Sequence, residues 1–192
     1  LEIGEVAEPQ PGPGEVKVRI RACALNRLDT YVRMGARGLK HEFPPLHIPG
    51  GDASGDIAEI GPNVAGLKSG DRVLINPWIS CGTCNYCESG QDNLCFNGQM
   101  LGNQRNGCYA EYAVVPATNV FLIPSHLSYQ EAAALPTVYL PAWNILVRQA
   151  QLKPSEHCLV LSASSGVGSA GIQVAKNVVG ANCIATTSTV EK

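Results

Sequence analysis

The sequence predicts a β-rich domain followed by the start of an α/β domain. Three observations lead to this expectation. Short β-prone runs dominate roughly the first 125 residues, a capped helix opens near residue 128, and an apolar run, a glycine-rich turn, a helix and a second apolar run then follow in order. The 20 glycines and 13 prolines among the 192 residues supply the turns that short strands need.

The first part begins with a clear strand pattern at residues 15–24. Apolar side chains from Val16 to Ala22 alternate with those of Lys17, Arg19 and Arg21, so one face is expected to be buried and the other exposed. A short helix is expected at residues 26–34 and a loop rich in glycine and proline at 43–55. Further strands are expected at residues 55–60, 72–76, 109–115 and 120–123.

The character of the chain changes at Ser128, which forms a capping box with Glu131. Pro136 and Pro141 are expected to divide the alanine-rich region that follows into two helical pieces, with Pro141 in the first turn of the second piece at 142–151. A strand at 158–161, a helix at 167–179 and a strand at 183–185 then form one β-α-β unit. The expected domains are residues 1–126, linking helices at 127–156 and an incomplete α/β domain at 157–192.

Composition and charge exclude several classes of protein. The formal net charge of −2 leaves no basic surface that would steer the chain onto nucleic acid. The uncharged stretch at 158–175 is interrupted by serines and glycines, so neither a membrane span nor a membrane partner is expected. The crowding of the cysteines indicates a reducing, cytoplasmic location, and the expected partner is a small molecule.

Four of the eight cysteines lie in one short loop with the spacing C-x2-C-x2-C-x7-C. Four thiolates suit a tetrahedral zinc ion, and four protein ligands leave no place for water or substrate, which indicates a structural site. An iron–sulfur cluster or disulfides would also use four cysteines, although a reducing context disfavours disulfides. The expected metal ligands are Cys81, Cys84, Cys87 and Cys95. The remaining cysteines are expected to be small core residues, namely Cys23, Cys108, Cys158 and Cys183.

The glycine-rich turn carries the pattern G-x-G-x-x-G between a strand and a helix. In this context Gly166 is expected to permit the tight turn, Gly168 to let a pyrophosphate approach the backbone, and Gly171 to let the helix pack closely on the strand. The phosphate would face the N-terminus of the helix. A turn kept only for packing is the alternative. The residues of the turn that are expected to bind a dinucleotide are Ser164, Ser165, Gly166, Val167, Gly168 and Gly171.

The residues about 20 positions after the turn distinguish NAD from NADP, because an acidic side chain there binds the ribose 2′-hydroxyl. Residues 186–189 read Thr-Thr-Ser-Thr and contain no carboxylate, which favours NADPH over NADH. Thr187, Ser188 and Lys192 are expected to receive a 2′-phosphate, although Glu191 lies beside them.

Taken together, these features resemble the medium-chain dehydrogenase/reductase superfamily, which comprises the zinc-type alcohol dehydrogenases and their quinone oxidoreductase relatives. The resemblance covers essentially the whole chain. It rests on the Gly-Asp-Arg-Val stretch at 70–73, the cysteine loop, residues 107–112, the alanine-rich segment at 132–136 and the turn at 164–171. It implies a GroES-like β-rich domain that carries the substrate site, the start of a Rossmann domain that binds NAD(P), and a homodimer or homotetramer for the full-length protein.

The chain departs from the zinc-type members at two positions. Those enzymes hold a second, catalytic zinc with a cysteine and a histidine where this sequence has Asn26 and Gly51. An asparagine amide is a poor zinc ligand and glycine offers none, so the resemblance implies chemistry without a catalytic zinc. Residues 26–31 instead resemble the Asn-x-x-Asp-x-Tyr stretch of zinc-free quinone oxidoreductases.

This second resemblance implies that Asn26 and Tyr31 lie on the substrate side and that Thr137 lies near the nicotinamide. Simpler roles are also open: Asn26 as a helix cap, Asp29 as a surface charge and Tyr31 as a core residue.

The resemblance therefore implies an NADPH-dependent reductase of quinones or α,β-unsaturated carbonyl compounds with one structural zinc. Without a Lewis acid, hydrogen-bond donors would stabilise the oxygen that gains charge. A zinc-dependent alcohol dehydrogenase with substituted ligands and a non-catalytic, zinc-stabilised nucleotide-binding protein are the alternatives. Because a complete domain of this type has six parallel strands, the chain is expected to be truncated at both ends and inactive by itself.

Overall fold

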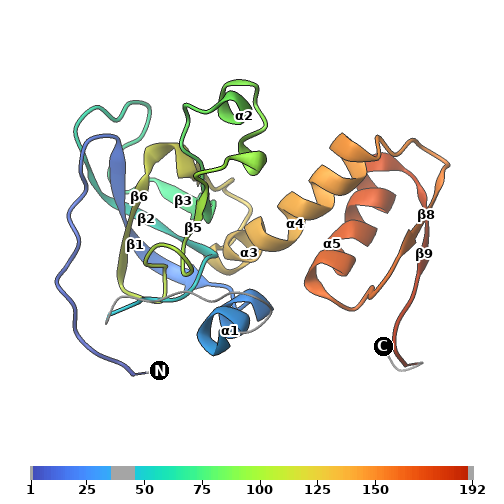
Figure 1. Cartoon of the computed structure of the whole chain (residues 1–192), viewed down its shortest axis with the longest axis horizontal. Helices are drawn as coiled ribbons and strands as arrows, with labels where there is room; N and C mark the ends of the chain where they lie inside the picture. Colours follow the sequence, from blue (N-terminus) through green and yellow to red (C-terminus); the bar gives the residue numbers. More distant parts are fainter. Residues whose placement is uncertain (1, 36–45, 190–192) are drawn as a thin grey trace. The chain divides into compact units, whose positions relative to one another are not determined.

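A computed structural model describes residues 2–35 and 46–189 of the chain. The chain divides into two compact units, Leu1–Ala134 and Leu135–Lys192 (Figure 1). The division falls within the segment expected to hold the linking helices. No helix of the described ranges has both the length and the apolar character that crossing a membrane requires.

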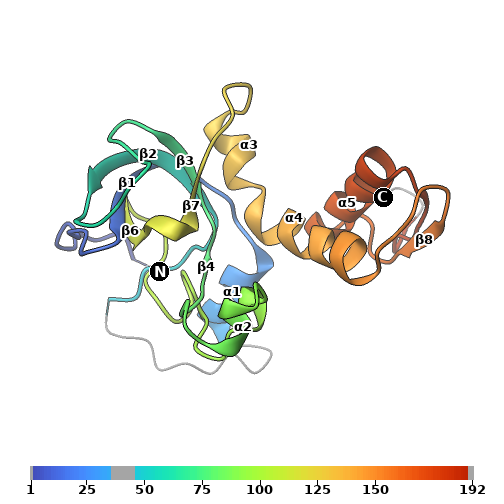
Figure 2. The same cartoon turned by 90° about the horizontal axis from the view of Figure 1, so that it is seen from above.

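The first unit is built on a five-stranded antiparallel sheet with the strand order β6-β1-β2-β3-β7. Its strands curve around a shared interior (Figure 2). The five strands expected from the sequence are present, as β1 Glu15–Cys23, β2 Ala53–Ile60, β3 Arg72–Ile75, β6 Tyr112–Pro116 and β7 Val120–Leu122. Strand β6 begins three residues later than expected, because the backbone N–H of Tyr109 donates to the carbonyl of Pro49 at 3.0 Å instead of extending the ladder.

The core of this unit lies on the inner face of the sheet. Val16 and Val18 of β1 are fully buried there, together with Ile57, Ile75 and Val115 from the neighbouring strands. β-branched side chains suit this position because they pack well on a pleated surface. The alternation of β1 thus predicts its buried face correctly.

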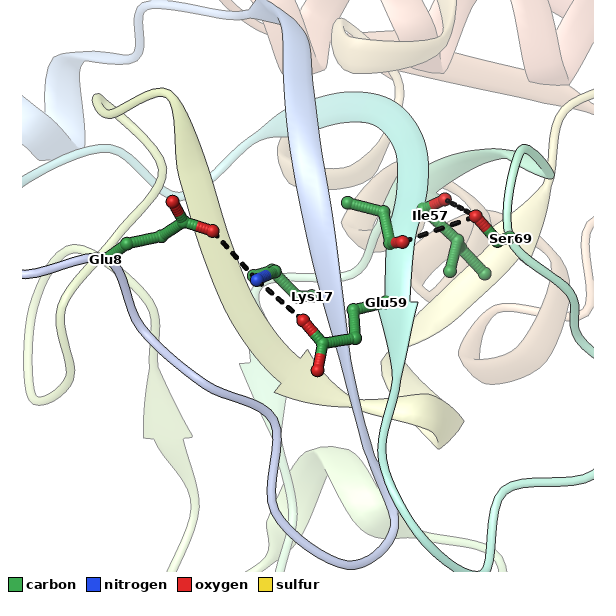
Figure 3. A network of polar contacts seen from close by, with 6 residues as sticks. Glu8, Lys17, Ile57, Glu59 and Ser69 are labelled. Carbon is green, nitrogen blue, oxygen red and sulfur yellow. Dashed lines mark hydrogen bonds and ion pairs between the residues drawn. The ribbon is translucent and has the colours of Figure 1, made fainter.

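Lys17 is an exception, and its expected exposure is wrong. Its side chain is only 7 % exposed, and its Nζ lies 2.8 Å from Glu8 Oε1 and 2.7 Å from Glu59 Oε2 (Figure 3). The hydrogen bonds to Glu59 and then Glu8 raise the pKa of Lys17. The N-terminal segment that carries Glu8 therefore covers the polar face of β1 at Lys17. The ion pairs of Lys17 with Glu8 and Glu59 link that segment to β2.

Helix α3 (Tyr129–Ala133) begins with the expected capping box. The Oγ of Ser128 accepts the N–H of Glu131 at 3.2 Å, and the Glu131 carboxylate accepts the N–H of Ser128 at 2.8 Å. Two backbone donors that the helix itself cannot satisfy are thereby paired.

The same helix is fastened to the sheet through Asp56 of β2. The hydroxyl of Tyr129 donates to one carboxylate oxygen of Asp56, and Arg21 Nε lies 2.7 Å from the other. The guanidinium of Arg72 lies over the Tyr129 ring at 4.6 Å from its centroid. Burial by itself would raise the pKa of Asp56, but the hydrogen bonds from Tyr129 and Arg21 outweigh it and hold that pKa below its usual range.

The second unit contains one β-α-β unit preceded by a helix. Parallel strands β8 (His157–Val160) and β9 (Asn182–Ala185) pair in register. Between them run α5 (Gly166–Gln173) and its π-helical continuation η4 (Val174–Val179), as the sequence predicts apart from the π geometry.

The expected break at Pro141 is absent. Helix α4 runs from Pro136 to Trp143 and continues as the π-helical segment η3 (Asn144–Gln149). Pro136 takes the first helical position, where no backbone N–H is needed, and Pro141 lies inside the helix. Proline in a helix interior removes one hydrogen bond and crowds the preceding turn, which fits the local change to wider winding after Trp143.

Candidate functional site

The four-cysteine loop forms a set of ligands suited to a metal ion. The Sγ atoms of Cys84 and Cys87 are 3.5 Å apart, those of Cys81 and Cys87 are 3.9 Å apart, and those of Cys84 and Cys95 are 3.9 Å apart. A tetrahedral zinc with Zn–S bonds of about 2.3 Å would hold its sulfurs about 3.8 Å apart. All four sulfurs lie within 4.8 Å of one another, which suits a single ion better than an iron–sulfur cluster, whose four thiolates are distributed over two or four irons.

Short elements position these four cysteines. The loop contains β4 (Trp78–Ile79), α2 (Asn85–Glu88), the 3₁₀ turn η1 (Asp92–Leu94) and β5 (Gln99–Met100), and Cys84 and Cys95 immediately flank α2 and η1. The indole N–H of Trp78 donates to the carbonyl of Asp92 at 2.9 Å. The Trp78 ring packs against Gly98 so closely that no larger residue fits there.

Backbone donors within the loop lower the pKa of Cys81 and of Cys84 and so favour the ionised thiolate that a metal requires at these two positions. The N–H of Thr83 lowers the pKa of Cys81 to about 6. The N–H of Cys81 donates to Cys95 Sγ at 3.3 Å and lowers the pKa of that thiol, but burial and the neighbouring Cys81 and Cys87 thiols outweigh it and raise the pKa to about 11. The donor set and its surroundings therefore fit a closed, structural metal site.

The glycine-rich turn differs in detail from the sequence expectation. Ser165 is the N-cap of α5, and its Oγ accepts the N–H of Gly168 at 3.1 Å. Ser162, rather than a glycine, adopts the left-handed conformation, with φ of 54°. A Cβ at Gly168 would collide with the carbonyl of Ser162, so only glycine fits at this position. At Gly171 a Cβ would meet only Leu146 Cδ1 at 3.9 Å, so the expected close packing of helix on strand at Gly171 is wrong for the described residues.

The carboxyl ends of β8 and β9 meet beside this turn. The N–H of Thr186 donates to the carbonyl of Val160 at 3.1 Å, and the N–H of Ala163 donates to the carbonyl of Thr186 at 2.9 Å. Thr187, whose hydroxyl donates to the carbonyl of Thr189 at 2.6 Å, and Ser188 follow directly. Both are exposed residues, whereas Lys192 lies outside the described residues.

Thr137 lies near the turn within the second unit. It is the second residue of α4 and is half-buried. Its neighbour Val138 approaches the turn so closely that a Cβ on Gly166 would lie 2.7 Å from Val138 Cγ1. Within this unit the structure thus brings the start of α4 next to the start of α5.

A second group of polar residues lies in the first unit around helix α1 (Arg27–Met34). Asn26 is the N-cap of α1, and its side-chain amide donates to Asp52 Oδ2 at 3.0 Å. Asp29 Oδ2 accepts the backbone N–H of Asn26 at 2.7 Å and the hydroxyl of Tyr109 at 2.9 Å. Burial and the Asp29 carboxylate raise the pKa of Tyr109, so this phenol is a protonated donor at neutral pH.

These contacts correct the simpler expectations for α1. Asp29 is a half-buried acceptor rather than a surface charge, and Asn26 binds Asp52 in addition to starting the helix. Tyr31 lies on the same helix and is half-buried. Sequence reasoning did not select Asp52 or Tyr109 as site residues.

One sequence signal could have found these two residues. Gly50 has a φ of 94°, and the ring of Tyr109 packs directly onto it, so the consecutive glycines before Asp52 mark a close approach of two segments. Asp52 itself is 1 % exposed, and a buried carboxylate requires partners.

Gly51 stands where the resemblance places the zinc-binding histidine of the zinc-type alcohol dehydrogenases. A Cβ on Gly51 would lie 3.3 Å from Pro77 Cβ and 3.4 Å from the Leu101 carbonyl, so a larger side chain would have to displace its surroundings. With an amide at Asn26 and no side chain at Gly51, the donor set here does not fit a catalytic zinc.

The first unit is a curled β-rich domain with a four-cysteine loop, and the second contains a strand, a glycine-rich turn and a helix in that order. The family described as "Alcohol dehydrogenase GroES-like domain" matches residues 12–125. The chain belongs to this family and, with it, to the medium-chain dehydrogenase/reductase superfamily.

Individual relatives agree with this assignment. An NAD-dependent alcohol dehydrogenase of Sulfolobus acidocaldarius is 35 % identical over 183 residues, which are 94 % of this chain and 53 % of that protein. An acryloyl-coenzyme A reductase of Metallosphaera sedula is 33 % identical over 194 residues, which cover 100 % of this chain and 56 % of that protein. The crystal structure of an NAD-dependent alcohol dehydrogenase superposes with a TM-score of 0.93 at 45 % identity, covering 98 % of this chain and 54 % of that one. The chain thus spans about half the length of these relatives.

Proposed function

We propose that this chain belongs to an NADPH-dependent reductase of quinones or α,β-unsaturated carbonyl compounds that works without a catalytic zinc. The observation that carries this proposal is the donor set beside α1, where the Asn26 amide is bound to Asp52 and Gly51 has no side chain. The name of the acryloyl-coenzyme A reductase denotes reduction of such a conjugated system, which supports this substrate class.

Hydrogen-bond donors take the place of a Lewis acid in this proposal. An asparagine amide has two N–H groups, and the one bonded to Asp52 holds the side chain in a fixed orientation while the other is assigned to the substrate oxygen. Tyr31 is assigned to the same side as a second donor. NADPH supplies the hydride when it is bound. Conjugated substrates suit such a site because negative charge then collects on the oxygen that the donors bind.

The nucleotide is assigned to the turn at residues 164–171, with Thr137 near its nicotinamide. The bare backbone at Gly168 and the N-terminus of α5 support a diphosphate there. Thr187, Ser188 and Lys192 are assigned to the 2′-phosphate.

Replacing Thr186 by Asp should weaken NADPH binding about tenfold through charge repulsion, whereas the uncharged control Thr186→Asn should not. Calorimetric titration of both nucleotides measures the difference, and equal effects of the two variants would contradict the assignment.

The cysteine loop is assigned to one structural zinc, because its sulfur separations fit a tetrahedral ion and no position is left for substrate. A reducing, cytoplasmic location is assigned from the crowding of four cysteines in one loop.

An alcohol dehydrogenase is the second candidate, because several relatives carry that name. Full-length protein separates the two candidates. The proposed reductase should contain about one zinc per chain and should reduce a quinone or enone panel with NADPH. Two zinc ions per chain, with alcohol oxidation that a chelator abolishes, would establish the alternative instead. Nucleotide binding without turnover of either panel would indicate a non-catalytic protein, and sedimentation of the same sample tests the expected homodimer or homotetramer.

A further inference from the structure

Two cysteines outside the metal loop face each other across the parallel strands of the second unit. Cys158 of β8 and Cys183 of β9 are register partners, and their Sγ atoms are 3.3 Å apart. Both are only partly buried, so the expectation that they are core residues is wrong, as it is for the exposed Cys23, while Cys108 is fully buried as expected. Neither Cys158 nor Cys183 has a role in the proposed reaction.

The backbone already provides the geometry of a disulfide. Neighbouring strands lie about 4.8 Å apart, which places the Cα atoms of register partners within the range that disulfides span. The sulfurs need to approach by little more than 1 Å to reach the bond length of about 2.05 Å. Rotation about the side-chain bonds can supply such a movement without shifting the strands.

Hydrogen bonds on either side of the pair keep the two strands together. The N–H of Asn182 donates to the carbonyl of Glu156 at 2.7 Å before the pair, and that of Thr186 donates to the carbonyl of Val160 at 3.1 Å after it. The two thiols therefore remain neighbours as long as the β-α-β unit is folded, which gives them a high effective concentration for each other.

We propose that Cys158 and Cys183 form a reversible disulfide with a low-molecular-weight disulfide as oxidant. One thiolate attacks a sulfur of the small disulfide, which breaks its S–S bond and releases one small thiol. The second protein thiolate then attacks the mixed disulfide and releases the other small thiol. Two protein thiols are thereby oxidised to one protein disulfide, two protons are released, and the small disulfide is reduced to two thiolates that take up those protons.

The protonation state of Cys158 makes thiol–disulfide exchange at this pair slow. Burial, with a further contribution from the neighbouring thiol, raises the pKa of Cys158 to about 11, so its thiolate is scarce at neutral pH. Oxidation should accordingly be slow and should respond to sustained changes in the thiol–disulfide balance. The disulfide would join β8, which leads into the glycine-rich turn, to β9, which ends beside that turn.

The test uses the zinc-loaded protein in glutathione buffers of increasing oxidised fraction, followed by alkylation of the remaining thiols and mass spectrometry. Trypsin does not cut between Lys153 and Pro154, so Cys158 lies in the peptide 149–176 and Cys183 in the peptide 177–192. We expect these two peptides to become joined with a loss of two hydrogens, and dithiothreitol to separate them.

Cys158→Ser and Cys183→Ser should each abolish the joined peptide, while the matched control Cys23→Ser should leave its yield unchanged. Stable mixed disulfides with glutathione at both cysteines, or both thiols fully alkylated in the most oxidising buffer, would overturn the proposal. Both results are read from the unsubstituted protein, so they do not depend on whether the variants fold.

Discussion

The hydrogen bond between Asn26 and Asp52 can be tested quantitatively. Asp52 is 1 % exposed, and Asn26→Ala removes an amide N–H that lies 3.0 Å from its carboxylate. A hydrogen bond to a charged group contributes about 1.5–3 kcal/mol, and the carboxylate stays buried after the substitution. Asn26 is also the N-cap of α1 in a capping box with Asp29, so the substitution removes that cap as well as the bond to Asp52. We expect Asn26→Ala to lower the free energy of unfolding by about 2 kcal/mol.

Urea denaturation followed by tryptophan fluorescence measures this change. The two tryptophans are Trp78 in the first unit and Trp143 in the second, so a Trp143→Phe background makes the signal report on the first unit. As a control, Asn106→Ala removes an exposed asparagine whose Oδ1 accepts the N–H of Ile48 at 3.1 Å, and it should cost about 0.5 kcal/mol or less.

A double-mutant cycle isolates the interaction itself. Asn26→Ala should be less destabilising in an Asp52→Asn background, because the buried charge that needs the donor is then absent, and the coupling energy should exceed about 1 kcal/mol. Additive effects, with a coupling energy below about 0.5 kcal/mol, would refute the reasoning and with it the proposed orientation of the Asn26 amide.

Three further predictions concern the rest of the chain. Gly168→Ala should destabilise the second unit by about 1–3 kcal/mol and weaken nucleotide binding because its Cβ collides with the Ser162 carbonyl, whereas Gly171→Ala, which has room, should be neutral or stabilising in thermal unfolding. Tyr129→Phe should lower stability by about 1–2 kcal/mol at pH 7. Since the pKa of Asp56 is lowered in the folded state, the stability difference between the wild type and Tyr129→Phe should persist above about pH 4. It should vanish as the pH falls through the pKa that Asp56 has in the folded protein. A stability difference that does not depend on pH in urea titrations would contradict this expectation. Removing the metal with a chelator should unfold the cysteine loop, which hydrogen exchange would detect, while the glycine-rich turn keeps its protection against exchange. An equal loss of protection in the cysteine loop and in the glycine-rich turn would argue against a local structural role of the metal.

The sequence alone determined the features whose chemistry lies within a short stretch of chain. The spacing of the four cysteines in one loop predicts their convergence, and the pattern after Cys158 predicts the strand, turn and helix that the structure contains. The alternation of β1 predicts its buried face for the same reason, because side chains two residues apart share a face whatever the rest of the fold does.

Only the tertiary structure decided which distant groups meet. Asp52 faces Asn26, Tyr109 reaches Asp29, and Glu8 covers Lys17 because strands and loops far apart in the sequence are brought together by their pairing. A single sequence carries the local period of each strand but not the identity of its neighbour or their register. The metal loop and the turn could therefore be predicted by spacing, whereas the polar cluster around α1 and the facing cysteines depend on the register of paired strands and on loop contacts that no local pattern encodes.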